Sequence, residues 1–262
     1  MKIVVLVKHV PDLQSERRLE DGTLVRGEDD VLNELDENAV EAAVALAEEA
    51  GGEVIAVTMG PEDAADGLMA ALQRGADRAL HVCDDAAAGS DVVGTARVLA
   101  AAIRSLGEVD LVVAGMASLD GLTSMVPGAV ASLLGMPSLT LASELSVAGG
   151  RVRIKRLADG FEDVLSAPLP AVVSVTDQLN EPRYPNFAAL KAARKKPLDT
   201  VELADLGLDE AEVGIAGAST GSLGEEMADA RGGGAVIEAG PDAGRAVVEF
   251  LAERGLLAGL ER

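Results

Sequence analysis

The residues Ile3-Val4-Val5-Leu6-Val7 decide the fold class of this chain. Five consecutive β-branched or leucine side chains leave no polar face, which is typical of a strand buried on both sides inside a parallel sheet. The polar residues Lys8 and His9, followed by Pro11, then end the strand. We therefore predict that the chain begins with an inner strand of an α/β sheet.

Strands and helices alternate after this first strand. Glycine and proline mark the boundaries at Gly51-Gly52, Gly60-Pro61 and Gly75. Further buried strands are expected at residues 53–59, 78–83, 110–114 and 171–176, and helices at residues 36–50, 62–74, 90–106 (with Ser90 as N-cap) and 126–134. This alternation predicts right-handed βαβ units and an α/β fold with a doubly wound, mostly parallel sheet.

Two stretches depart from the alternation. Residues 139–145 and 151–156 flank the turn at Gly149-Gly150, and we expect them to pair as a hairpin. Small and acidic residues dominate from about Leu203 until the amphipathic stretch 244–257. We therefore expect an α/β domain over residues 1–200 and a C-terminal arm over residues 201–262 whose helix packs on another protein, with a disordered tail as the alternative.

Composition and charge exclude several classes of protein. Hydrophobic residues make up 48% of the chain, yet no run reaches the roughly 18 apolar residues of a membrane span. The apolar run after Met1-Lys2 is too short for the core of a signal peptide, so a cytoplasmic location is expected. The net charge of −22 argues against binding to nucleic acid or to an anionic membrane.

Side-chain redox and metal chemistry is also disfavoured. A single cysteine, Cys83, excludes an intramolecular disulfide, and two histidines, His9 and His81, are too few for the usual soft-metal clusters. Cys83 and His81 stand two apart in an expected strand, where packing is the simpler interpretation than a nucleophile and its base. No metal ligand and no catalytic residue is predicted.

Two loops are expected at the carboxyl edge of the sheet, where open parallel sheets bind ligands. In the first loop, a buried strand ends at Gly115 and a polar stretch then opens a helix near Val126, so free backbone N–H groups could meet a phosphate. A tight connection is the alternative. In the second loop, residues 32–36, Asn33 either caps the following helix or contacts a base or ribose.

A third segment, residues 179–191, combines prolines, aromatic residues and a basic run. Pro182 and Pro185 hold the chain extended and display Tyr184 and Phe187. The basic residues of the run are Arg183, Lys191, Arg194, Lys195 and Lys196. Such an aromatic anchor among basic residues is typical of a protein contact, although the same residues could instead close the edge of the core.

Several blocks of the sequence together resemble the β subunits of electron-transfer flavoproteins. The strongest block is Leu169 to Thr176 followed by Leu179-Asn-Glu-Pro-Arg-Tyr184 and the lysine-rich helix. The other blocks follow in the family's order along almost the whole chain: Val7 to Asp12 (His9 stands where glutamine is common), Asp36 to Ala43, Gly60-Pro61, Gly75 to Ala79 and Asp110 to Gly115.

The resemblance implies an adenine-nucleotide-α-hydrolase-like domain over residues 1–200 that pairs with a larger α subunit. In such heterodimers the α subunit holds most of the electron-carrying FAD, and the β subunit holds a structural AMP. By position, the AMP would lie against Leu6, Val7, Asn33, Glu34, Leu35, Asp36, Met59, Ala117, Asp120, Gly121, Thr123, Ser124, Met125 and Val126. Thr123 and Ser124 would be the phosphate donors. Asp120 would brace the loop or face the ribose, because a carboxylate beside a phosphate costs Coulomb energy.

The same resemblance gives residues 180–196 a role as the family's recognition loop, with Phe187 in the place of an anchoring leucine. Tyr184, Leu190 and Lys191 would complete the contact with an acyl-CoA dehydrogenase-type flavoenzyme. The chain would be an electron carrier of fatty acid oxidation that passes electrons toward the respiratory chain, and not an enzyme.

Three alternatives remain at this point. A bifurcating form would place a second FAD in the AMP site and use the same loops. A nucleotide-binding regulator of the universal-stress type would form a homodimer without an α subunit. An ATP-cleaving ligase would need a Ser-Gly-Gly-type loop after the first strand, and Lys8 to Pro11 does not provide one.

Overall fold

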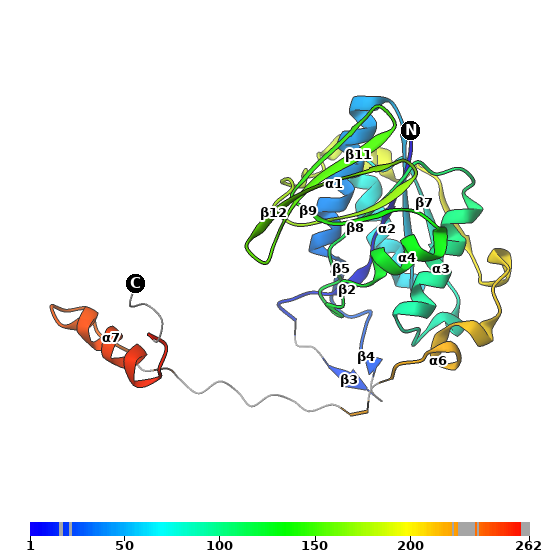
Figure 1. Cartoon of the computed structure of the whole chain (residues 1–262). Helices are drawn as coiled ribbons and strands as arrows, with labels where there is room; N and C mark the ends of the chain where they lie inside the picture. Colours follow the sequence, from blue (N-terminus) through cyan, green and yellow to red (C-terminus); the bar gives the residue numbers. More distant parts are fainter. Residues whose placement is uncertain (16–17, 21–22, 222, 225–233, 235, 258–262) are drawn as a thin grey trace. The chain divides into compact units, whose positions relative to one another are not determined.

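The computed structural model describes residues 1–15, 18–20, 23–221, 223–224, 234 and 236–257. These residues fall into two units, Met1–Gly224 and Glu225–Arg262. The first unit contains the sheet and its helices (Figure 1). In the described part of the second unit, helix α7 (Ala243–Glu253) is amphipathic and contains no buried residue. Packing of a C-terminal arm on another subunit stays a prediction.

A seven-stranded sheet forms the centre of the first unit, and every strand pair within it is parallel. The strand order is β14-β7-β6-β1-β8-β13-β9. The strands span β1 Lys2–Leu6, β6 Glu53–Met59, β7 Arg78–Val82, β8 Leu111–Gly115, β9 Ser138–Ala142, β13 Ala171–Val175 and β14 Leu198–Val201. The prediction of a doubly wound α/β fold is confirmed.

Helices cover both faces of this sheet because successive side chains of each inner strand point to opposite faces. On β1, Ile3 and Val5 pack with α1 and α2, whereas Val4 and Leu6 pack with α3 and α4. Helix α5 adds Ala193 to the first of these layers. The helices span α1 Glu34–Ala50, α2 Ala65–Arg74 after the 3-10 turn η1 Glu62–Ala64, α3 Val92–Ser105, α4 Val126–Leu134 and α5 Phe187–Ala193. The N-cap of α3 is Asp91, not Ser90, because the Asp91 carboxylate accepts the N–H groups of Val93 and Gly94 in the first turn.

The strand order places a topological switch point between β1 and β8. The chain runs from β1 to β6 and β7 on one side, and helix α3 then returns it to β8 on the other side of β1. The connections after β1 and β8 therefore diverge, which leaves space at the carboxyl ends of these two strands. This edge is where the sequence places the nucleotide loops.

The expected hairpin of residues 139–145 and 151–156 is wrong in part. Residues 139–142 belong to β9 of the main sheet, and the strand that pairs with β11 from the N-terminal side is a separate one that begins only at Glu144. A positive φ at Leu141 and a register shift opposite it redirect the chain between the two strands. The resulting sheet contains β10 Glu144–Ala148, β11 Arg151–Ala158 and β12 Phe161–Pro168 (Figure 1, green).

Shorter elements surround the core. Near the N-terminus lie β2 His9–Pro11 paired with β5 Asp30–Leu32, and β3 Leu19–Glu20 paired with β4 Thr23–Leu24. The remaining short helices are η2 Asp85–Ala87, η3 Ala204–Leu206, η4 Glu210–Glu212 and α6 Gly214–Gly217. Leu203 and Val213 are buried in the core of the first unit, so this unit includes residues 201–224 as well as the predicted domain. Within the described ranges, no helix combines the length and the apolar character that crossing a bilayer requires.

Candidate functional site

The loops that follow β1 and β8 lie against the N-terminal end of α1, and we call residues 6–8, 32–36 and 115–126 the rim. Gly115 ends β8 and leaves no room for a side chain: a Cβ there would lie 2.4 Å from Asp36 Oδ1 and 2.8 Å from the Leu35 carbonyl carbon. The backbone of β8 therefore packs directly against the start of α1, with no space for a side chain between them. This contact brings the rim segments together at the switch point.

Asn33 joins two of the rim segments from a fully buried position. Its amide nitrogen donates to the Ala117 carbonyl (3.0 Å), and its amide oxygen accepts from the Leu119 N–H (3.0 Å). The residue occupies the N-cap position of α1, but its side chain makes no capping bond to the backbone of that helix. Of the two roles considered for Asn33, the side-chain cap is therefore wrong, because the amide is already used to hold the 117–119 loop.

Asp36 bridges the ends of β1 and β8. Its carboxylate accepts the Lys8 N–H (2.9 Å) and the Gly115 N–H, and it also bonds to the Asn33 side chain. Burial raises the pKa of Asp36 to about 7, although these hydrogen bonds and Lys8 lower it in part. A carboxyl group that fastens two strand ends therefore titrates near neutral pH.

Asp120 lies within the loop after β8, and its carboxylate pairs with two cations. Lys8 Nζ donates to Asp120 Oδ2 at 2.7 Å, and the Arg26 guanidinium donates to the same oxygen. Burial alone would raise the pKa of Asp120, but the charge and hydrogen bond of Lys8 and the hydrogen bond of Arg26 lower it well below its usual range. Its second oxygen, Oδ1, is buried and accepts no hydrogen bond of normal geometry among the described residues, although the Ser118 hydroxyl is near enough to help lower the pKa of the carboxyl. Asp120 braces the loop and retains one free acceptor.

The stretch from Gly121 to Met125 is the open part of the rim. All five residues are exposed, and both Leu122 (φ 50°) and Ser124 (φ 54°) have left-handed backbone conformations. Such conformations in residues other than glycine are uncommon and occur most often at functional sites. Thr123 and Ser124, the predicted phosphate donors, therefore lie on an accessible and conformationally unusual loop.

The remaining residues predicted to contact the nucleotide differ in accessibility. Leu6, Val7 and Ala117 are buried; Leu35, Met59 and Val126 are half-buried; Glu34 is exposed. Sequence reasoning missed Lys8 in the rim and Arg26, which contacts the rim through Asp120. Lys8 directly follows β1 and could have been found from the carboxyl-edge rule, whereas Arg26 lies in a loop without any such signal.

A second region, residues 180–196, is fastened to α1, and we call it the docking segment. Asn180 and Asn38 exchange hydrogen bonds between their side chains and backbone carbonyls at 3.0 Å. The Arg183 guanidinium bonds both Glu41 (2.7 Å from Nε) and Glu48 (2.7 Å from Nη1) in fork geometry. The extended chain is thereby fixed before it reaches the aromatic residues.

The predicted anchors project from this fixed base. Tyr184 is 94% exposed and Phe187 is 84% exposed, whereas Leu190 is half-buried and Lys191 is exposed. Asn186 caps α5 by accepting the Ala189 N–H at 2.9 Å. The aromatic side chains do not seal the edge of the core, so that alternative is excluded.

The predicted basic run is smaller than the sequence suggests. Arg183 is committed to the two glutamates, and Lys196 donates to the carbonyls of Leu72 (3.0 Å) and Ala76 (2.6 Å). Lys191, Arg194 and Lys195 are exposed. Three of the five cations are therefore available to a partner.

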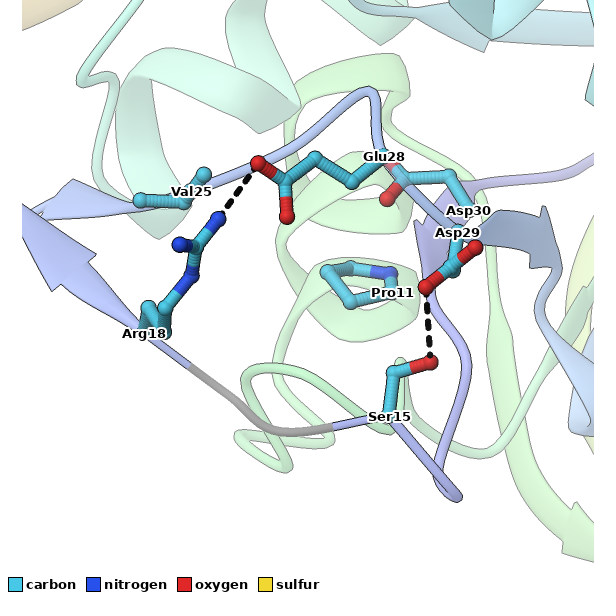
Figure 2. A pocket seen from close by; sticks show the side chains of 7 residues that line it. All are labelled: Pro11, Ser15, Arg18, Val25, Glu28, Asp29 and Asp30. Atoms are coloured by element: carbon cyan, nitrogen blue, oxygen red, sulfur yellow. Dashed lines mark hydrogen bonds and ion pairs between the residues drawn. The ribbon is translucent and has the colours of Figure 1, made fainter.

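Two cavities lie outside the predicted rim. One of about 190 Å³ lies between α2 and the docking segment. Another of about 240 Å³ is lined by residues from Pro11 to Asp30, and Figure 2 shows Arg18 paired with Glu28 and Ser15 bonded to Asp29. Its lining contains three carboxylates and one cation, so this second cavity does not suit a phosphate.

Cys83 and His81 do not form a catalytic pair. The His81 ring is buried and its Nε2 lies 3.0 Å from the Gly60 carbonyl, so it serves packing. Burial, followed by the charges of Glu62, Asp85, Asp84 and Glu202, raises the pKa of the Cys83 thiol. A thiol with a raised pKa is a poor nucleophile at neutral pH.

The family of the chain follows from comparison with known proteins. The model of the "Electron transfer flavoprotein domain" family matches residues 21–206. An electron transfer flavoprotein subunit beta of Mycobacterium leprae is 41% identical, with 97% of this chain and 99% of the relative covered, and that of Mycobacterium bovis is 39% identical over the same shares. The caffeyl-CoA reductase-Etf complex subunit CarD of Acetobacterium woodii is 35% identical, covering 90% of this chain and 92% of the relative. The fold, the order of the sequence blocks and these matches agree: the chain belongs to the β-subunit family of electron transfer flavoproteins.

Proposed function

We propose that this electron transfer subunit binds a structural AMP at the rim. It pairs with an α subunit that holds most of the electron-carrying FAD. The main support is the buried Asp120 Oδ1, which has no hydrogen-bond partner among the described residues, on a carboxylate whose other oxygen binds two cations at the switch point of the sheet. A ribose hydroxyl is a donor that would satisfy this oxygen, because an unpaired buried acceptor costs roughly 1–3 kcal/mol.

Local charge supports an adenylate at one end of the rim. Lys8 and Arg26 carry two positive charges against the one negative charge of Asp120, in a chain whose net charge is −22. Helix α4, which follows the Thr123–Ser124 loop, has no acidic residue in its first turn, whereas α1 has Glu34, Asp36 and Glu37. The positive end of the α4 dipole is therefore the better place for a phosphate.

The residues divide into those that hold the nucleotide and those that shape its site. Thr123, Ser124 and the backbone near Met125 and Val126 would bind the phosphate, and Asp120 would accept from the ribose. Leu6 and Met59, which end β1 and β6, and Val7, which directly follows β1, would pack on the adenine. Asn33 is buried and its amide is engaged with the 117–119 loop, so we give it a positioning role.

Electron transfer itself is the chemistry of the flavin when it is bound. This chain contributes the docking segment, which would contact acyl-CoA dehydrogenase-type flavoenzymes through Phe187, Tyr184, Leu190 and Lys191. A single exposed anchor, surrounded by residues that add little binding energy, suits a short-lived encounter, because a small contact dissociates quickly. We further propose that the electrons pass toward the respiratory chain, that the pair works in fatty acid oxidation and that it is cytoplasmic.

The nucleotide content of the purified heterodimer tests the proposal. The complex is denatured, the protein is removed, and the released nucleotides are separated and quantified by chromatography. One AMP and one FAD per heterodimer is the expected result. Absence of any adenine nucleotide beyond FAD, at one FAD per complex, would contradict nucleotide binding by the rim.

A second candidate is a form with FAD in place of AMP at the rim. Similarity to a subunit named for a caffeyl-CoA reductase-Etf complex favours keeping this candidate. It predicts two FAD and no AMP in the same measurement. The universal-stress-type regulator and the ATP-cleaving ligase are not pursued, because the chain belongs to the electron transfer flavoprotein family.

A further inference from the structure

We propose that His9, Asp30 and Asp63 bind one Zn²⁺ ion on the side of the sheet where the N-terminal hairpin meets α2. The three residues come from separate segments: His9 from β2, Asp30 from β5 and Asp63 from η1. Each offers one ligand atom, and these atoms all lie within 4.8 Å of one another. This inference does not depend on the nucleotide proposal.

The buried Asp30 carboxylate is the observation that points to a cation. Its side chain is only 4% exposed, and that of His9 is 9% exposed. The nearest partner of Asp30 is His9 Nδ1 at 3.9 Å, which is too long for a hydrogen bond, and no hydrogen-bond donor to the Asp30 side chain is found in the described part of the chain. A carboxylate with so little solvent contact and no donor is costly unless a positive charge lies beside it.

Among the described residues, only the His9 ring, when protonated, could supply that charge, because the nearby arginine and lysine are bonded elsewhere. Arg26, the closest in sequence, donates to the backbone carbonyl of His9 (3.2 Å) and to Asp120, and Lys8 also bonds Asp120. Asp63 instead adds a second carboxylate to the cluster. A divalent ion would neutralise both aspartates and use the free imidazole nitrogen at the same time.

The donor set selects the ion. One imidazole nitrogen with two carboxylate oxygens suits Zn²⁺, whereas Mg²⁺ and Ca²⁺ prefer oxygen ligands alone. Two ligands at about 2.1 Å from one tetrahedral Zn²⁺ lie about 3.4 Å apart, so ligand atoms as far apart as 4.8 Å would close by up to roughly 1.4 Å on binding. Three protein ligands leave the fourth position to water. This cluster was not predicted from the sequence, because the metal-site patterns considered there consist of cysteine and several histidines.

The position of the ion gives it a structural role. His9 follows Lys8, whose N–H and Nζ hold Asp36 and Asp120 in the rim. An ion on His9, Asp30 and Asp63 would fasten the β2–β5 hairpin to the start of α2 and thereby fix the chain that leads into the rim. Metal binding should therefore raise the thermal stability of the protein.

The test uses the full-length chain copurified with its large subunit and stripped of metal with EDTA. Titration with ZnCl₂ is followed by calorimetry and by thermal unfolding. We expect saturable binding of Zn²⁺ in the micromolar range or tighter, a rise in Tm of roughly 2–6 °C, and a much weaker response to MgCl₂. Asp30→Asn and Asp63→Asn should each weaken Zn²⁺ binding at least tenfold. His9→Gln should reduce the ratio of the affinity for Zn²⁺ to the affinity for Mg²⁺.

Glu62→Gln is the matched control, because it removes an exposed carboxylate next to Asp63 and should leave Zn²⁺ binding unchanged. Unaltered binding in both aspartate variants would overturn the proposal. So would weak binding at many sites that about 0.15 M salt removes, which indicates an adventitious ion only. Anomalous scattering at the zinc edge from a wild-type crystal gives an answer independent of variant folding: a peak between the three side chains supports the site, and its absence after zinc soaking refutes it.

Discussion

In the rim, Asn33 is fully buried and its amide joins two loops, whereas in the docking segment Asn186 is exposed and its amide caps a short helix. The contrast extends to the other side chains of the two regions. In the rim, the Asp36 carboxylate is buried and Gly115 packs directly against α1. In the docking segment, Tyr184 and Phe187 are exposed. A resident ligand requires a rigid, internally bonded site, while a transient partner requires a fixed base with a free anchor. Substitutions in the rim should therefore change stability, and those at the docking anchors should change partner kinetics.

The pH dependence of stability gives the largest expected difference. The pKa of Asp36 is raised to about 7 by burial, so between pH 4 and 7 the folded state binds a proton that the unfolded state releases. This contribution is fully present below pH 4 and is lost as pH rises through 7, for a total of about 4 kcal/mol at 1.36 kcal/mol per pKa unit. The side chain of the Asp36→Asn variant cannot titrate, so its free energy of unfolding should decrease less between pH 5 and 8 than that of the wild type. Urea unfolding at pH 5, 6, 7 and 8 measures this difference.

Glu34→Gln removes an exposed carboxylate from the same helical turn and should leave most of that pH slope in place. The Asp36 assignment would be refuted if Asp36→Asn kept the slope of the wild type. The docking segment supplies no counterpart, since its acidic contacts, Glu41 and Glu48, have pKa values lowered by Arg183 in spite of the burial of Glu41.

Gly115→Ala should destabilise the chain by about 3 kcal/mol. Its Cβ would meet Asp36 Oδ1 at 2.4 Å and the Leu35 backbone at 2.8 Å, and backbone atoms cannot move away cheaply. The matched control is Gly128→Ala in α4, where a Cβ meets nothing within 4 Å and a gain of up to about 1 kcal/mol is expected from helix propensity. Chemical denaturation measures both, and equal effects would show that the close contact at the rim is not rigid.

The two asparagines allow a direct comparison of the regions. Asn33→Ala removes both bonds to the 117–119 loop and leaves the buried Ala117 carbonyl without its donor, which should cost about 2 kcal/mol. Asn186→Ala removes only the cap of α5 and should cost about 1 kcal/mol or less. If AMP occupies the rim, only Asn33→Ala should also lower the AMP content of the purified complex. A larger stability loss from Asn186→Ala would contradict the proposed division of roles.

The main sheet could be predicted from sequence because its strands are continuous apolar runs between glycine and proline boundaries. The expected strand 53–59 matches β6 and the expected helix 126–134 matches α4. The β12 strand was missed, although the dipeptide Asp159-Gly160, with φ of 51° and 79°, is a strong hairpin signal. The error at residues 139–145 has a different origin, since a bulge at Leu141 leaves no mark in the apolar pattern.

The rim was predicted as loops but not as a network of contacts. The carboxyl-edge rule identifies residues 32–36 and 115–126 because they follow buried strands. It does not show that Asp120 pairs with Lys8 and Arg26, which are 112 and 94 residues away in sequence. Long-range side-chain pairs of this kind depend on how the loops pack. A single sequence read by itself contains no signal for them.

The smallest effect on stability and the most specific effect on function are expected at Phe187. Its side chain is 84% exposed, so Phe187→Ala should change the free energy of unfolding by no more than about 0.5 kcal/mol and should leave assembly and flavin content intact. Loss of a buried aromatic anchor in the encounter should nevertheless slow flavin reduction by the partner dehydrogenase roughly 10–100-fold. Stopped-flow reduction, expressed per assembled flavin, measures this rate.

The control for this anchor is Phe161→Ala, which removes another exposed phenylalanine (73%) from the start of β12. Both substitutions delete the same apolar surface, so a general effect of lost hydrophobicity would slow both variants equally. A specific anchor slows only the Phe187 variant, because only that side chain stands on a segment that Arg183 and Asn180 fasten to α1. Breaking the Arg183 contact should then also slow flavin reduction, though less than Phe187→Ala does. An anchor on a mobile segment loses more conformational entropy when it docks. Normal kinetics in Phe187→Ala would remove this residue from the docking role and leave Tyr184 as the aromatic side chain to test.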